Sequence, residues 1–145
     1  MAVKSEIILT EDECMSLIDE WQVRLSLEDW TVYLSYLPSN SEIIIGGKEQ
    51  KGYSTRGGAN INFYTKDIVI FIYNPTEKDR LNNPLAPWDM EYTIVHELTH
   101  VHFAHAAQAY NGPDDYDNKS IVLLEQSVDA MAKALIALKR GIVDE

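Results

Sequence analysis

The chain has 145 residues and a formal net charge of −11, from 23 acidic and 12 basic residues. That length is usual for one domain, and we expect residues 1–145 to form a single domain with its own core. Hydrophobic residues make up 46% of the sequence, as in ordinary globular proteins. An acidic chain without a basic cluster repels phosphate groups, so neither nucleic acid nor an anionic membrane is expected as a partner.

Cysteine content and the N-terminal sequence favour a cytoplasmic protein. Cys14 is the only cysteine in the sequence, so no intramolecular disulfide is expected. The residues MAVKSEIILTEDE lack the apolar stretch and the cleavage site of a signal peptide. No apolar run approaches the roughly 18 residues that a transmembrane helix needs. Cys14 falls in a predicted amphipathic helix with no histidine near it in sequence, which favours a packing role over a nucleophile.

The first predicted element is a helix that begins after Thr10. Thr10 and Glu13 have the Ser/Thr-x-x-Glu spacing of a capping box, which is typical of a helix start. The helix is expected to end near Ser26. Apolar residues recur through it at helical spacing: Met15, Leu17, Ile18, Trp21 and Leu25.

A small sheet of three to four strands is expected next. Segments rich in β-branched and aromatic residues predict strands at 30–37, 43–45, 59–64 and 68–73. Residues 65–67 are few enough to join the last two strands as a hairpin. The strand at 68–73 is apolar throughout, so both of its faces are expected to be covered. The strand at 59–64 is a candidate edge for pairing with an extended peptide.

Two helices complete the predicted fold, which is therefore of the α+β class. The first runs from Trp88 to about 109, where Asn-Gly-Pro at 111–113 stops it. The second is capped by Asp117 or Asn118 and runs to about Arg140. Gly141 stands where a helix-terminating glycine is expected.

The first of these helices contains an HExxH motif, His96-Glu97-Leu98-Thr99-His100. Histidines four residues apart lie on one helical face, so both imidazoles can bind a single ion. A glutamate directly after the first histidine can reach a metal-bound water without binding the metal itself. The motif therefore predicts one Zn2+ ion per chain, with Glu97 as the general base of a hydrolytic reaction.

A catalytic zinc usually has three protein ligands, and Glu125 fits best as the third. His102 and His105 are rotated away from the ligand face by about 200° and about 140°. The helix from His100 to 109 is about 14 Å long, and that from 119 to Glu125 about 9 Å. Antiparallel packing of the two helices would thus return Glu125 to roughly the level of His100.

Asp129 lies one turn after Glu125, on the same face and nearer His96. It is expected to accept the Nδ1 proton of that histidine and so fix the tautomer that binds metal. The sequence at this point resembles the gluzincin branch of zinc metallopeptidases, which includes the thermolysin-like enzymes. The resemblance rests on HExxH followed by Glu125-x-x-x-Asp129, and the short chain is similar to the minimal gluzincins.

The resemblance implies a zincin-like fold and hydrolysis of peptide bonds. His96, His100 and Glu125 would be the zinc ligands, Glu97 the general base and later the proton donor, and Asp129 the residue behind the ligands. No further domain is evident after Glu125 to form the second wall of a cleft, so a homo-oligomer or a partner chain is the expected source of that wall.

Three functions stay open at this stage. The leading one is a zinc-dependent metallopeptidase acting on a peptide or protein substrate. The others are a zinc amidase acting on a non-protein amide and a non-catalytic, metal-stabilised module that binds or regulates. The residue that stabilises the oxyanion is not distinguished among four candidates: Tyr110, Tyr116, His102 and His105.

Overall fold

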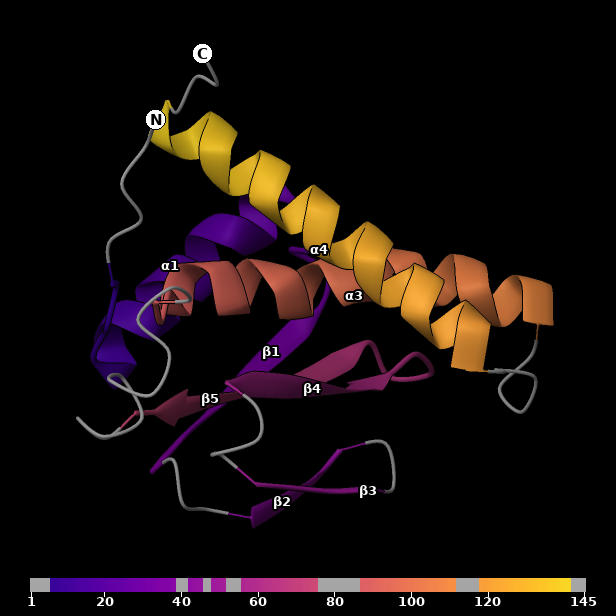
Figure 1. Ribbon diagram of the computed structural model, residues 1–145, viewed down its shortest axis with the longest axis horizontal. Helices are drawn as coiled ribbons and strands as arrows, with labels where there is room; N and C mark the ends of the chain where they lie inside the picture. The colour runs from indigo at the N-terminus through magenta and orange to yellow at the C-terminus, as the bar shows by residue number, and fades with distance from the viewer. Residues whose placement is uncertain are drawn as a thin grey trace.

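The computed structural model describes the backbone of residues 6–38, 42–45, 48–51, 56–75, 87–111 and 118–141, and the side chains of 6–38, 56–75, 87–103 and 122–141. Helix α1 (Glu11–Arg24) comes first, and helices α3 (Met90–Asn111) and α4 (Asn118–Arg140) come last. Between them lie strands β1 (Thr31–Pro38), β2 (Glu42–Ile45), β3 (Lys48–Lys51), β4 (Gly57–Asn62) and β5 (Asp67–Asn74). The predicted α+β class and the predicted order of elements are confirmed (Figure 1).

Helix α1 begins at the predicted capping box. The Thr10 side chain accepts a hydrogen bond from the backbone N–H of Glu13 at 3.2 Å, and the Glu13 carboxylate accepts one from the Thr10 N–H at 3.0 Å. Both bonds satisfy N–H groups that have no partner within the helix. The helix ends at Arg24, with Leu25 as its C-cap, and Ser26 follows with a φ of 58°.

The main sheet has three strands in the order β1-β5-β4. Strand β5 is central: it pairs in parallel with β1 and antiparallel with β4, to which it is joined by the predicted hairpin. Ile68, Ile70 and Ile72 are buried on one face of β5, and Val69 and Phe71 on the other face are half-buried. A central position explains why this segment is apolar throughout.

Strands β2 and β3 form a separate two-stranded antiparallel sheet. The sequence pattern predicts β2 and misses β3, because β3 has the sequence KEQK and carries no apolar residue. Its strand geometry comes from pairing with β2, a contact that hydrophobic periodicity does not report.

Helix α3 is the central helix of the fold. It packs against β4 and β5 on one side, against α1 on another, and against α4, which crosses it on the side away from the sheet (Figure 1). One apolar cluster joins these elements, and it includes Trp21 and Trp30. Its helix residues include Trp21 of α1, four residues of α3 and two of α4: Ile94, Val95, Leu98, Val101, Ala132 and Ile136. Within the described segments, no helix is both long enough and apolar enough to cross a bilayer.

Gly57 allows β4 to approach α3 closely. A Cβ atom at this position would lie 2.6 Å from Cγ2 of Thr93 and 2.7 Å from the carbonyl oxygen of Phe71. We expect Gly57→Ala to lower the free energy of unfolding by about 1–3 kcal/mol, because the helix or the strand must shift. Urea unfolding measures this change. The Thr93→Ala change should recover part of the loss in the double variant, and a Gly57→Ala protein as stable as wild type would contradict the close packing.

The C-terminal end of α4 is held to the start of α3 by a cluster of charges around the buried Glu91, the Glu91 network. Glu91, whose side chain is 7% exposed, accepts hydrogen bonds from Trp21 Nε1 at 2.9 Å, from Arg140 Nη2 at 3.1 Å and from Lys139 Nζ. Arg140 also binds both carboxylate oxygens of Asp89, at 2.8 and 3.1 Å. The network thus connects α1, α3 and α4 at the end of α4 remote from Glu125.

Candidate metal centre

His96 and His100 lie one turn apart on α3, and their Nε2 atoms are 3.3 Å from each other. Both side chains are mostly buried, at 17% and 16% exposed. The apolar residues between and beside them, Val95 and Leu98, belong to the core and orient this part of the helix. The two rings therefore project from a rigid element, as the HExxH spacing predicts.

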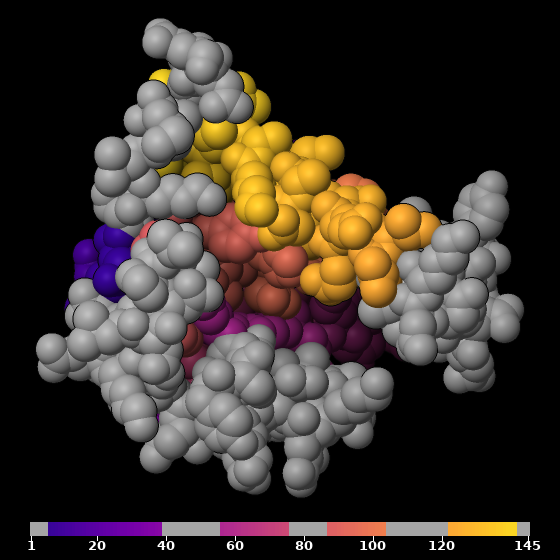
Figure 2. Space-filling view, in the orientation of Figure 1, coloured from indigo at the N-terminus to yellow at the C-terminus, as the bar shows by residue number. Residues whose placement is uncertain are grey.

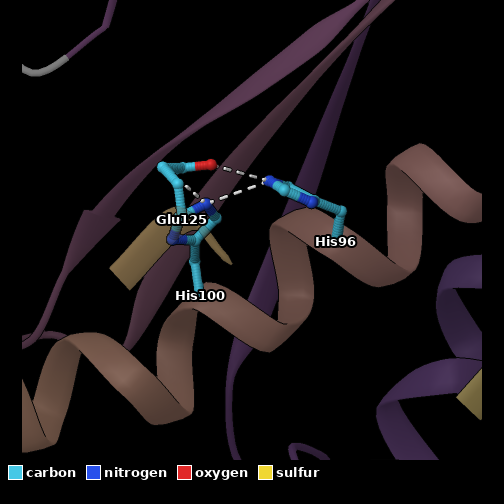
Figure 3. A group of neighbouring side chains, drawn as sticks. All are labelled: His96, His100 and Glu125. Carbon is cyan, nitrogen blue, oxygen red and sulfur yellow. Dashed lines mark hydrogen bonds and ion pairs between the residues drawn. The ribbon is translucent and has the colours of Figure 1, made fainter. Parts of the chain in front are cut away.

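Glu125 of α4 meets both histidines. Its Oε2 is 3.3 Å from Nε2 of His96, and its Oε1 is 3.0 Å from Nε2 of His100. The three side chains point toward one another, with strands of the sheet behind them (Figure 3). They come from α3 and α4, which cross in Figure 1. The structure thus brings Glu125 to the level of His100, where counting residues along an antiparallel helix pair expects it.

The donor atoms of these three residues fit a small divalent cation. All lie within 4.8 Å of one another, and the closest contacts between them are 3.0–3.3 Å. Ligand atoms about 2.0–2.1 Å from a tetrahedral zinc are about 3.3 Å apart, so the observed spacing needs little adjustment. Two imidazoles and one carboxylate form the three-ligand set of catalytic zinc sites, which leaves a fourth position open.

Contacts with the histidines hold the pKa of the Glu125 carboxyl well below its usual range, although half of the side chain is exposed to solvent. Burial alone would lower the pKa of His100. The hydrogen bond to Glu125 and the nearby charge of Glu97 outweigh burial, so the pKa of His100 is raised. The site therefore presents a carboxylate at neutral pH, which attracts a cation to the two imidazoles.

Glu97 is buried beside this group, at 8% exposed. Burial raises the pKa of its carboxyl, and the charge of Glu125 adds to the shift, whereas His100 and His96 oppose it. Glu97 thus interacts with all three candidate ligands without being one of them. A buried glutamate of raised pKa next to a cation site is the arrangement expected of a general base.

Two residues, Asp129 and Tyr92, are candidates for a contact with Nδ1 of His96. Asp129 forms an ion pair with Lys133 of the next turn at 2.8 Å, and among the described residues it accepts no hydrogen bond from His96. The contact at Nδ1 of His96 is instead with the hydroxyl of Tyr92, at 3.4 Å. Sequence reasoning missed Tyr92, although its position four residues before His96 places it on the same helical face.

The other candidate residues lie elsewhere. His102 faces α1, where its Nε2 is 2.7 Å from the carbonyl oxygen of Leu25, which agrees with its predicted rotation away from the ligand face. The side chains of His105 and Tyr110, and all of Tyr116, lie outside the described residues. Cys14 is fully buried, and burial with smaller effects of Glu13 and Glu11 raises its pKa to about 11, so the thiol is unreactive at neutral pH.

Comparison with known proteins does not place this chain in a family. It matches no protein-family model, no curated protein and no solved structure.

Proposed function

We propose that this protein is a zinc-dependent metallopeptidase of the gluzincin type. The observation that carries the proposal is the meeting of His96, His100 and Glu125 within 4.8 Å beside the buried carboxyl of Glu97. Three ligands without a base would suit a structural site. A base without ligands would have no activated water to act on.

Zinc suits this donor set best, because it accepts nitrogen and oxygen ligands in tetrahedral geometry. When bound, the ion would lower the pKa of a water molecule toward about 7 and polarise the carbonyl group of the substrate. The chain itself contributes the rest. His96 and His100 would hold the ion through Nε2, and Glu125 would hold it through a carboxylate that also offsets its charge.

Glu97 would move the proton. Its carboxylate takes a proton from the water that attacks the peptide carbonyl, and the raised pKa favours keeping that proton while the tetrahedral species exists. The carboxyl group then gives the proton to the leaving amine, which completes cleavage of the C–N bond. Glu97 is a buried residue of α3, so its side chain is restricted and both transfers would occur from one position.

The surroundings of the site leave room for a substrate. Glu125 is 51% exposed, so the ligand group is open to solvent on the α4 side. Strand β4, one of the two outer strands of the main sheet, packs against α3, the helix that carries the motif, and also contacts β2. Figure 2 shows α3 between α4 and the strands of the sheet on this face of the molecule.

The proposed reaction is tested with the untagged protein, a diverse peptide library and mass spectrometry of the products. Zinc-loaded protein is expected to cleave peptides, chelator-treated protein to be inactive, and zinc added back to restore cleavage. Failure of the zinc-loaded protein to cleave any peptide would contradict the peptidase. The site would then belong either to a zinc amidase that acts on another amide or to a non-catalytic module.

The proposal also includes a cytoplasmic location, and a homo-oligomer or partner chain that completes the cleft.

A further inference from the structure

The two nitrogens of the His96 ring face different surroundings. Nε2 is directed at Glu125 and His100, as Figure 3 shows. If Nε2 binds a cation, it carries no proton, and the proton of the neutral ring is on Nδ1. Because His96 is only 17% exposed, that N–H needs an acceptor within the protein.

Tyr92 is in position to be this acceptor. Its hydroxyl oxygen is 3.4 Å from Nδ1, at the long end of hydrogen-bond distances, and the two ring centroids are 5.8 Å apart. The tyrosine ring is partly buried against the core cluster, and the Tyr92 backbone N–H donates to Asp89 at the start of α3. The backbone bond holds the first turn of the helix, and the packing of the ring restricts the phenol, which places its hydroxyl group beside the imidazole.

Asp129 is less suited to the same task in this structure. Its carboxylate is 2.8 Å from Nζ of Lys133, and its side chain is 39% exposed. Among the described residues it makes no contact with His96, so serving that histidine would require its side chain to move. Tyr92 needs no such rearrangement, because it lies on the same helix as His96, one turn before it.

We propose that Tyr92 is a positioning residue for the metal centre: its hydroxyl accepts the Nδ1–H of His96 and so holds the ring in the tautomer and orientation that present Nε2 to zinc. The role rests on the proposed function, since it assumes that a cation binds at Nε2. A phenol hydroxyl group carries no full charge and polarises the imidazole less than a carboxylate does. Loss of its hydroxyl should therefore weaken zinc binding by about tenfold, the lower end for such partners.

The test compares Tyr92→Phe with wild type and with Tyr64→Phe, which removes a hydroxyl from a fully exposed tyrosine. Zinc affinity is measured by competition with a chromophoric chelator. The His96 tautomer is read in the zinc-loaded proteins by nitrogen-15 NMR, and thermal unfolding of the zinc-free proteins checks the fold. The Asp129→Ala variant is measured in parallel.

The expected result is about tenfold weaker zinc binding in Tyr92→Phe, no change in Tyr64→Phe or Asp129→Ala, and an Nδ1–H resonance of His96 that shifts only in Tyr92→Phe. The zinc-free proteins should unfold at similar temperatures. Zinc binding within twofold of wild type in Tyr92→Phe, a zinc-loaded His96 protonated at Nε2, or a larger loss in Asp129→Ala would overturn the role of Tyr92 alone. A wild-type protein that binds no zinc would overturn the metallopeptidase with it.

Discussion

Replacing Glu97 by Gln is expected to leave zinc bound and to lower kcat/KM for peptide hydrolysis by about 10²–10⁴-fold. The amide has nearly the shape of the carboxyl group but cannot take a proton from water. Zinc content should stay at the wild-type level, because the proposed ligands His96, His100 and Glu125 are untouched. Peptide cleavage and metal content are measured on the same samples. Together they distinguish activity lost with the general base from activity lost with the zinc ion.

The same substitution is expected to maintain or raise stability. Burial raises the pKa of Glu97, so keeping this carboxylate charged at neutral pH costs free energy that Gln does not. A matched Glu→Gln change at the exposed Glu28 should alter neither activity nor stability. Retained hydrolysis in Glu97→Gln would remove Glu97 from the mechanism. Lost hydrolysis together with lost zinc would mean that the variant had disturbed the site itself.

Replacing Glu91 by Ala is expected to lower the free energy of unfolding by about 1–3 kcal/mol. The Glu91 side chain is 7% exposed, and its removal leaves the buried indole N–H of Trp21 without its acceptor, whereas Lys139 keeps Glu20 and Arg140 keeps Asp89 as partners. Urea unfolding gives the magnitude. Asp29→Asn is the control, because Asp29 pairs with Lys66 at the surface and its loss should change little. A Glu91→Ala protein as stable as this control would contradict the Glu91 network.

Acid should weaken the wild-type protein partly through the same residue. Burial raises the pKa of Glu91, but the surrounding hydrogen bonds and cations outweigh burial and hold it below its ordinary value of 4.5. A group whose pKa is lowered on folding adds stability above pH 4.5, and this stability is lost as the pH falls through the lower folded value. Thermal unfolding between pH 7 and about 3 should therefore show a smaller acid dependence in Glu91→Gln than in wild type. If the unfolding temperatures of the two proteins fell equally with pH, Glu91 would not be held ionised by the fold.

The parts of the fold that local sequence determines could be predicted. The Thr10–Glu13 capping box places the start of α1, and Gly141, with a φ of +67°, ends α4 where a left-handed residue is needed. The short turn between β4 and β5 gives their hairpin. Glu125 could be singled out because helix geometry has a fixed rise, so counting residues through an antiparallel pair of helices measures distance.

The parts of the fold that depend on pairing between residues far apart in the sequence could not be predicted. The parallel pairing of β1 with β5 joins residues such as Thr31 and Asp67, and nothing in either segment specifies the other. The Glu91 network connects residues 48 to 70 positions apart, and in the sequence Glu91 is only one acidic residue near a helix start. Spacing places Asp129 and Tyr92 equally well near His96. Only the structure shows that Lys133 pairs with Asp129 whereas the hydroxyl of Tyr92 contacts the imidazole.

The metal content of the untagged protein tests the central claim most directly. Elemental analysis is made after dialysis against buffered zinc, on wild type, on Glu125→Ala, and on a control in which the exposed neighbour Gln126 is replaced by Ala. The proposed centre predicts about one zinc per chain in wild type and in the control, and far less in Glu125→Ala. Equal zinc in all three proteins would show that Glu125 is not a ligand. No zinc in any of them would mean that His96, His100 and Glu125 meet without forming a metal site.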